Sequence, residues 1–253
     1  MFYLIGIGLK PEHLSLEACS AIKKCRHVFI EQYTSSFSEG TKKRLERLIG
    51  KKCIELGRKA IEEEFNQLVE KSLSSNACLL VIGNPLMAST HSSLLDEMKK
   101  NGSKFSIIPG ISITDFLPFT GLSSYKFGKI TTIVFPEKNF SPTSFFNIIE
   151  KNNESGLHTL CLLDIKKEQK KLMTIKQALQ ILMQIAKEKN STILNTNLLV
   201  GIARAGAKDM KIVAGNFEKL MKTNFGKTPH SLIICSKLDF NEEEAIKILT
   251  TKK

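Results

Sequence analysis

The sequence predicts an α/β fold built from two domains, residues 1–122 and 123–253. The length of 253 residues suits two domains of about 100–150 residues each. Apolar, strand-like runs alternate with amphipathic helical segments through the first ~120 residues, which is typical of a mostly parallel sheet with helices on both faces. Beyond that point, short turns as well as helices join the strand-like runs, so we expect a mixed α+β second domain.

The strands of the first domain are short apolar runs that end in turn residues, and its helices carry apolar residues at helical spacing. Leu16, Cys19 and Ile22 mark such a helical face, and Asn101-Gly102 is a common helix stop. The expected strands are residues 2–6, 27–30, 53–56, 77–82 and 105–108. The expected helices are residues 15–24, 42–49, 60–73 and 91–100.

The second domain begins where the pattern changes, around residues 123–128. A Thr- and Ile-rich run at residues 131–135 opens it, and such β-branched residues favour strands. Further strands are expected at residues 159–165, 198–203, 211–214 and 231–235. Helices are expected at residues 174–188 and 241–249.

The formal net charge of +12 is the most prominent feature of the composition. A basic surface attracts anionic partners, and nucleic acid is the first to consider. However, the basic clusters Lys42-Lys43-Arg44, Lys99-Lys100 and Lys166-Lys167 are dispersed and interleaved with acidic or apolar residues. This pattern favours solvated helix faces and requires no direct nucleic-acid binding. A basic face that meets an RNA-associated protein partner remains open.

Cysteine and histidine spacing argues against a metal site. The six cysteines form no CxxC pair and are typical of reduced, structural thiols. No HxH, HExxH or carboxylate-rich cluster occurs, and no GxSxG elbow of a hydrolase. The chain opens directly into a strand without a targeting segment, and no apolar stretch approaches the ~18–20 residues of a membrane span. We therefore expect a cytoplasmic protein without a membrane segment.

Three loops are expected to converge where parallel strands end, at residues 6–9, 83–90 and 109–114. Gly6-Ile7-Gly8-Leu9 lacks the third glycine of a dinucleotide fingerprint, and Gly83-Asn84-Pro85-Leu86 lacks the GK[ST] of a phosphate-binding loop. The second segment could equally be an ordinary turn, with Ser89 or Thr90 capping the next helix. Its small and hydroxylated residues leave room for a ligand near backbone groups, and a ligand without phosphates would fit the loop at residues 6–9 better than NAD would. His91 and His230 are the histidines best placed for ligand contact.

The chain resembles the diphthine synthase family, a branch of the tetrapyrrole-methylase-like S-adenosylmethionine enzymes, over nearly its whole length. Residues 83–91 are similar to the family's Gly-Asp-Pro-Leu-x-Ala-Thr-Thr-His pattern, and the length resembles that of archaeal members. Order and spacing make the match specific. The other matching segments are Tyr3-Leu4-Ile5-Gly6-Ile7-Gly8-Leu9, Glu31-Gln32-Tyr33-Thr34-Ser35, Tyr125-Lys126-Phe127-Gly128, Gly156-Leu157-His158-Thr159-Leu160, Leu163-Asp164-Ile165-Lys166, Ala203-Arg204-Ala205-Gly206 and Pro229-His230-Ser231-Leu232-Ile233.

The resemblance implies the two-domain tetrapyrrole-methylase-like fold with an S-adenosylmethionine cleft between the domains. One departure matters: the family usually has Asp where this chain has Asn84. Asn offers donors and an acceptor but no charge, so its bond to a cationic cofactor would be weaker by about 1 kcal/mol. Carried over position by position, the cofactor contacts fall on Leu9, Asn84, Met87, Ser112, Ile113, Leu163, Ala205 and His230.

The implied reaction is successive N-methylation of the 3-amino-3-carboxypropyl-histidine of translation elongation factor 2, giving diphthine for diphthamide biosynthesis and releasing S-adenosylhomocysteine. A homodimer is also implied. The sulfonium is an activated methyl donor, so alignment of the amine matters more than acid–base catalysis. The sequence identifies no catalytic base, and His91 and His230 stay open as candidates for that role. Two alternatives remain: a methylase of a porphyrinoid precursor, and a basic RNA-binding module, which the absence of an aromatic-rich strand motif disfavours.

Overall fold

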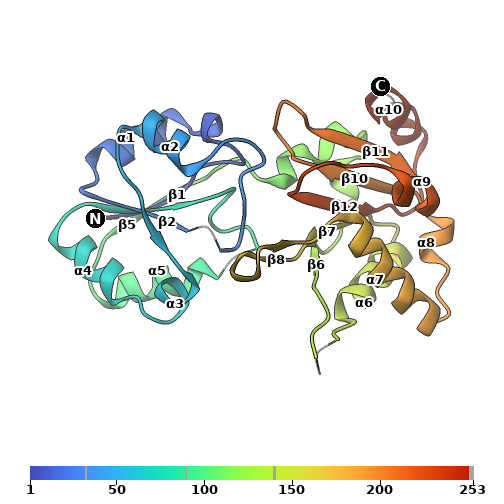
Figure 1. Ribbon diagram of the computed structural model, residues 1–253, viewed down its shortest axis with the longest axis horizontal. Helices are drawn as coiled ribbons and strands as arrows, with labels where there is room; N and C mark the ends of the chain where they lie inside the picture. Colours follow the sequence, from blue (N-terminus) through green and yellow to red (C-terminus); the bar gives the residue numbers. More distant parts are fainter. Residues whose placement is uncertain (32, 89, 139–140, 251–253) are drawn as a thin grey trace. The chain divides into compact units, whose positions relative to one another are not determined.

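The computed structural model describes residues 1–31, 33–88, 90–138 and 141–250 and consists of two compact units, Met1–Ile113 and Thr114–Lys253 (Figure 1). The 3₁₀ helix η2 (Ile113–Thr120) begins at the last residue of the first unit and continues into the second. A domain boundary at residue 122 stays a prediction. None of the helices within the described residues is long and apolar enough to cross a membrane.

The first unit is built on a five-stranded sheet. Its strands are β1 (Phe2–Gly6), β2 (His27–Glu31), β3 (Ile54–Leu56), β4 (Ala77–Val81) and β5 (Phe105–Ile108). They lie in the order β3-β2-β4-β1-β5, and every pairing is parallel. Parallel strands need crossover connections, which the intervening helices provide. The mostly parallel sheet expected from the alternating pattern is confirmed.

Successive side chains of these strands point to opposite faces of the sheet, as the period of two requires. Leu79 packs on one face with α3 (Arg58–Glu62), α4 (Asn66–Ser74) and α5 (His91–Lys100). Leu80 packs on the other face with α1 (Leu16–Lys24) and α2 (Lys42–Ile49). The two groups of helices lie on either side of the sheet in Figure 1. Helices on both faces were expected and are confirmed.

One expected helix, residues 60–73, is wrong, because the structure divides it into α3 and α4. Glu63 leaves the helical conformation with φ −130° and ψ −41°. The carbonyl of Lys59 accepts the N–H groups of both Glu63 (3.0 Å) and Glu64 (2.8 Å), which closes the first helix. Phe65 then packs on the core, and α4 begins directly after it.

The second unit contains a mixed five-stranded sheet, as expected. Its order is β11-β10-β12-β7-β6, with β6 parallel to β7 and the other pairs antiparallel. The strands are β6 (Thr131–Ile133), β7 (Thr159–Leu163), β10 (Leu199–Ala203), β11 (Lys211–Gly215) and β12 (His230–Ile234). The helices are α6 (Ser144–Glu154), α7 (Ile175–Glu188), α8 (Ile193–Thr196), α9 (Phe217–Lys222) and α10 (Phe240–Thr250). Phe146, Leu179 and Leu220 from these helices share one core with the strands.

Two expected strands of this unit, residues 131–135 and 159–165, are too long. The carboxylate of Asp164 accepts the N–H of Phe135 (3.0 Å), and its carbonyl accepts that of Met173 (2.9 Å). These bonds end β6 and β7 and turn the chain into a small separate hairpin of β8 (Ile165–Lys166) and β9 (Lys171–Leu172). The 3₁₀ helices η1 (Pro11–His13), η3 (Ser124–Lys126) and η4 (Lys167–Gln169) complete the described elements.

Candidate cofactor-binding site

The carboxyl edge of the first sheet has a switch in strand order. Strands β1 and β4 are neighbours, but the chain leaves β1 toward β2 and leaves β4 toward β5. Ligands of such sheets bind in the crevice at this point. The loops after the two strands touch there: Gly8 and Gly83 form an isolated bridge, and the N–H of Gly83 donates to the carbonyl of Gly8 (3.0 Å).

The loop after β5 joins the same edge through glycines. A Cβ atom on Gly6 would lie 2.5 Å from the Gly110 nitrogen and 2.6 Å from the Gly83 oxygen. A Cβ on Gly110 would lie 2.4 Å from that same oxygen. The three backbones are therefore in direct contact, and only glycine permits this approach. The expected convergence of the three loops is present, and it brings their backbones into contact at the carboxyl edge.

Five of the eight expected cofactor contacts lie in this unit, and three of them lie on the loops after β1 and β4. Leu9 is buried beside Gly83, with its Cδ2 3.9 Å from the Cβ position there. The side-chain oxygen of Asn84 accepts the N–H of Leu86 (3.2 Å), so it holds the turn after β4. Met87 is 40% exposed on that turn. These positions supply apolar surface and one polar side chain at the sheet edge.

The remaining two contacts of this unit follow β5. Ser112 is buried and Ile113 is half-buried. They come directly after the Pro109-Gly110 loop that packs on Gly6. The five positions of the first unit thus lie on the three loops at the carboxyl edge.

The other three expected contacts gather at one end of the second sheet. Leu163 closes β7, Ala205 follows β10, and His230 opens β12. In the antiparallel registers, Ala203 pairs with His230, and Leu162 pairs with Ser231. The three positions are therefore at neighbouring strand ends, although they are far apart in sequence, and all three are buried.

His230 has both ring nitrogens engaged. Nδ1 accepts the N–H of Ile175 (3.3 Å), and Nε2 lies 3.0 Å from the carbonyl of Lys227. Because a backbone N–H can only donate, Nδ1 carries no proton and Nε2–H donates to Lys227. Burial lowers the pKa of His230. This histidine is therefore neutral and held by the backbone, which suits positioning rather than proton transfer.

Arg204, within the expected Ala-Arg-Ala-Gly segment, fixes the loop that carries His230. Its guanidinium donates to the carbonyls of Phe225 (2.8 Å), Lys227 (2.5 Å) and Asp209 (2.7 Å), and Nε contacts the Asp209 carboxylate (2.8 Å). Sequence reasoning missed this role. An arginine between small residues beside a strand was the available signal, because a planar guanidinium can join several acceptors.

A buried histidine–carboxylate pair lies at the same edge as the glycine loops. His91 and Glu31 are each 1% exposed, and Nε2 of His91 lies 3.8 Å from a carboxylate oxygen of Glu31. Nδ1 donates to the carbonyl of Pro85 (2.8 Å), next to Asn84. The Glu31 carboxylate accepts the N–H (2.7 Å) and hydroxyl (2.8 Å) of Thr34. The pair therefore lies between the loops after β2 and β4.

The Nε2 atom of His91 is the one buried side-chain nitrogen or oxygen without a hydrogen-bond partner among the described residues. Thr90 does not cap α5 as the turn interpretation expected, because its hydroxyl donates to Glu62 (3.1 Å) instead. Gln32 and Ser89, which belong to the matching segments, lie outside the described residues.

The Tyr-Lys-Phe-Gly and Gly-Leu-His-Thr segments meet at Glu242 of α10. Its buried carboxylate receives Lys126 (2.5 Å), His158 (2.8 Å) and the N–H groups of Ser123 (2.9 Å) and Asp239 (3.1 Å). Burial alone would raise the pKa of Glu242, but these donors lower it to about 2. The network is fully paired, which indicates a structural role for these segments.

Within the described part of the chain, no group of three His, Cys, Asp or Glu side chains is placed to hold a metal ion. The six cysteines are free. Burial raises the pKa of the Cys161 and Cys235 thiols, which therefore stay protonated.

The family model described as tetrapyrrole (corrin/porphyrin) methylases matches residues 1–221 of this chain. A diphthine synthase from Methanocaldococcus jannaschii is 39% identical over 98% of each chain. One from Methanococcus aeolicus is 36% identical, again over 98% of each. A crystal structure of a diphthine synthase superposes with a TM-score of 0.88 and 30% identity, covering 99% of this chain and 96% of the other.

Proposed function

This chain belongs to the tetrapyrrole (corrin/porphyrin) methylase family, and from that premise we propose that it catalyses the diphthine synthase reaction. In this reaction an S-adenosylmethionine-dependent methyltransferase N-methylates the 3-amino-3-carboxypropyl-histidine of translation elongation factor 2. The observation that carries the proposal is the full-length similarity to proteins of that name, at 34–39% identity over 98% of the chain. The step belongs to diphthamide biosynthesis.

The proposed cofactor contacts are the eight positions given above, five in the first unit and three in the second. The close packing of Gly6, Gly83 and Gly110 supports this assignment, because it brings the three loops that carry five of the positions together at one edge of the sheet. Leu9 and Met87 offer apolar surface for an adenine or a thioether. Nothing in this set is arranged to bind pyrophosphate, which agrees with a cofactor that has none.

S-adenosylmethionine supplies an activated methyl group on a sulfonium. The protein must then hold the acceptor amine in line and keep water out. Neutral, backbone-anchored His230 and the buried side chains of Leu163 and Ala205 are suited to orientation and water exclusion. We assign no general base, because both ring nitrogens of His230 are engaged and the side chain of His91 is only 1% exposed.

We further propose a homodimer in the cytoplasm as the working form. Elongation factor 2 is a large protein substrate, so its capture requires an exposed surface as well as the cofactor edge. Sedimentation at micromolar protein concentration measures the oligomeric state directly; a monomer would contradict the homodimer without affecting the proposed reaction.

The decisive experiment is mass spectrometry of elongation factor 2 after incubation with the enzyme and methyl-labelled S-adenosylmethionine. We expect labelled mass additions of one methyl group at a time on the modified histidine. A parallel reaction offers a precorrin, the substrate of the alternative function. Methylation of the precorrin with none on elongation factor 2 would overturn the proposal.

A further inference from the structure

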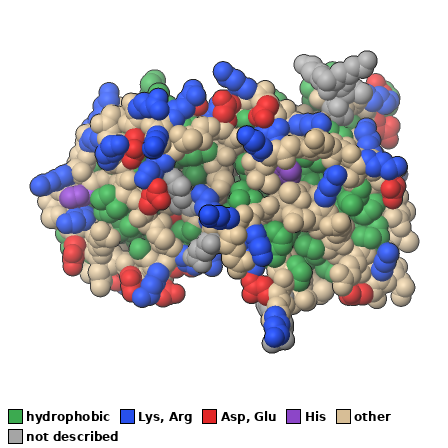
Figure 2. Space-filling model, in the orientation of Figure 1, with side chains coloured by type: hydrophobic (Ala, Val, Ile, Leu, Met, Phe, Trp, Pro, Cys, Tyr) green, Lys and Arg blue, Asp and Glu red, His purple; other side chains and the backbone are tan. Residues whose placement is uncertain are grey.

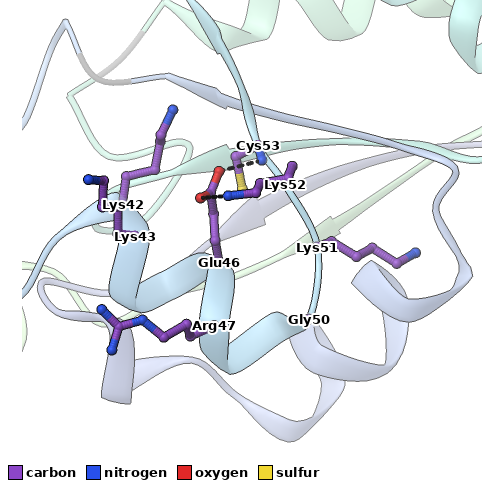
Figure 3. A pocket seen from close by; sticks show the side chains of 8 residues that line it. All are labelled: Lys42, Lys43, Glu46, Arg47, Gly50, Lys51, Lys52 and Cys53. Carbon is purple, nitrogen blue, oxygen red and sulfur yellow. Dashed lines mark hydrogen bonds and ion pairs between the residues drawn. The ribbon is translucent and has the colours of Figure 1, made fainter.

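The positive charge of this chain is concentrated on α2 and the turn that follows it. Residues 42–52 contain six lysine and arginine residues and one glutamate, a net +5 out of +12 for the whole chain. Figure 2 shows Lys and Arg side chains gathered over the part of the first unit that carries α1 and α2. The hollow beside α2 is lined by Lys42, Lys43, Glu46, Arg47, Gly50, Lys51, Lys52 and Cys53 (Figure 3).

The cations divide into those held locally and those facing solvent. Lys42 pairs with Glu55 (2.6 Å), and Lys52 pairs with Glu46 (3.4 Å). Lys51 donates to carbonyls at the end of α1, including that of Lys23 (2.9 Å). These three side chains therefore already have partners within the first unit.

The solvent face of α2 consists of Lys43, Arg44, Arg47 and Leu48. All four are exposed, whereas Leu45 and Ile49 on the opposite face are buried in the core. Figure 3 shows the side chains of Lys43 and Arg47 projecting to the same side of the helix. The two are one turn apart and carry no ion pair with the described residues, so they present two adjacent positive charges to a partner.

The first turn of α2 carries positive side chains, which are unfavourable at the N-terminus of a helix. The N-terminus of a helix carries a partial positive charge and favours acidic residues. The first turn of α2 instead contains Lys42, Lys43 and Arg44 and no acid. Arg44 and Lys42 are offset by Glu12 and Glu55, but Lys43 is not. Positions that violate a local stability rule are expected at functional sites, and an anionic partner would relieve this repulsion.

Apolar side chains beside these cations indicate the class of partner. Leu48 on α2 is 56% exposed, and Ile54 on the neighbouring edge strand β3 is 49% exposed. Protein interfaces combine apolar contacts with arginine. Single-stranded nucleic acid is bound by aromatic stacking, and the solvent face of α2 carries no aromatic residue. The surface therefore fits a protein better than RNA.

We propose that the solvent face of α2 is the docking surface for an acidic, partly apolar face of the protein substrate. This inference rests on the proposed function, because the substrate is the modified elongation factor 2. The side chains of this face point to solvent from a helix and do not belong to the glycine loops, so docking there would raise the affinity for the protein without using a cofactor contact. Lys43 and Arg47 supply the charge, and Leu48 supplies the apolar contact.

The test compares K43E/R47E with K176E/K187E, which reverses two exposed lysines of α7 and changes the net charge equally. Steady-state methylation of modified elongation factor 2 should give a KM at least tenfold higher for K43E/R47E, with kcat and the KM for S-adenosylmethionine unchanged. The α7 variant should change the KM for elongation factor 2 less than twofold. The single variant K43E should unfold at a temperature equal to or above that of the wild type, because an acid then occupies the first turn.

The outcomes separate this inference from the proposed function. If the wild type does not methylate elongation factor 2, the proposed function fails and the docking inference falls with it. If the wild type is active and K43E/R47E keeps its KM, only the docking surface is wrong. Binding of an RNA duplex of about 16 base pairs that is lost in K43E/R47E while KM stays constant would also overturn the inference, in favour of RNA.

Discussion

At the scale of single residues, Asn84 determines the charge of the turn after β4. Its side-chain oxygen accepts the N–H of Leu86, and aspartate would keep this bond while adding a negative charge. S-adenosylmethionine carries cationic groups, and a charge-assisted bond is roughly twice as strong as a neutral one. We expect N84D to bind S-adenosylmethionine about fivefold more tightly, a gain of about 1 kcal/mol, in a calorimetric titration.

The control for that variant is N66D, which adds the same charge at an exposed position of α4. It should leave the dissociation constant unchanged. Equal affinity of N84D and the wild type would mean that the side chain at position 84 only holds the turn and does not reach the cofactor.

His91 supports the same turn through one nitrogen. Nδ1 donates to the carbonyl of Pro85, and both groups are shielded from solvent by the first unit. Asparagine places its amide nitrogen near the position of Nδ1, whereas glutamine places it near that of Nε2. An unpaired buried carbonyl costs about 1–3 kcal/mol. We therefore expect H91Q to be less stable than H91N by about 1–2 kcal/mol in urea unfolding, and to bind S-adenosylmethionine more weakly. The reverse order would show that Nε2, facing Glu31, is the important atom.

The sequence pattern indicated that the residues around the turn after β4 are important, but it did not indicate which residues they contact. The pattern at residues 83–91 drew attention to Asn84 and His91. It could not indicate that the partner of His91 is Glu31, because that residue comes from another strand 60 positions earlier. Thr90 illustrates the same point. Its position before α5 predicts a cap, but Glu62 of a neighbouring helix competes for its hydroxyl.

At the scale of elements, Glu242 attaches α10 to β7 and η3. In E242Q one of the two acceptor oxygens becomes an NH2 group, which faces the donor of either Lys126 or His158. We therefore expect E242Q to lose about 2–3 kcal/mol of unfolding free energy at pH 7. E244Q on the same helix is the matched control. Glu244 forms an exposed pair with Lys247, and such pairs contribute little. Chemical denaturation of both variants measures the difference.

The same carboxylate has a defined pH dependence. Its pKa falls from 4.5 to about 2 in the folded chain. A lowered pKa stabilises the fold above pH 4.5, and this contribution is lost as the pH falls from 4.5 toward 2. The stability difference between the wild type and E242Q should therefore shrink below pH 4.5. A difference that stays constant down to pH 3 would contradict the assignment of this network.

The pattern of apolar residues predicted that a strand or helix is present, whereas the residue at which it ends depends on single polar contacts. The apolar run at residues 160–163 is followed by a single Asp164 and then Ile165, so sequence alone extends the strand past Asp164. The carboxylate of that residue ends two strands at once by accepting the N–H of Phe135. Helices α6, α8 and α9 were not predicted. The spacing of Phe145 and Ile149 was a usable signal for α6, and the capping Asn216 was one for α9.

At the scale of the whole molecule, alternation of strands and helices predicted the first sheet, and strands joined by short turns as well as helices predicted the mixed second domain. The order of strands did not follow from it. That β1 lies between β4 and β5 depends on tertiary packing, and this order creates the switch at which the glycine loops meet. The candidate site was therefore predictable as a set of loops, but not as contacts among Gly6, Gly83 and Gly110.

The net charge of +12 should make stability and substrate capture respond to salt in opposite directions. Like charges repel one another in the compact chain, and added salt screens this repulsion because the Debye length falls from about 30 Å at 0.01 M to about 8 Å at 0.15 M. The unfolding temperature should rise over that range. The same screening weakens attraction of an acidic protein, so kcat/KM for elongation factor 2 should fall at least threefold, with the KM for S-adenosylmethionine nearly constant. Changes of both quantities in one direction would mean that salt acts through specific ion binding rather than screening.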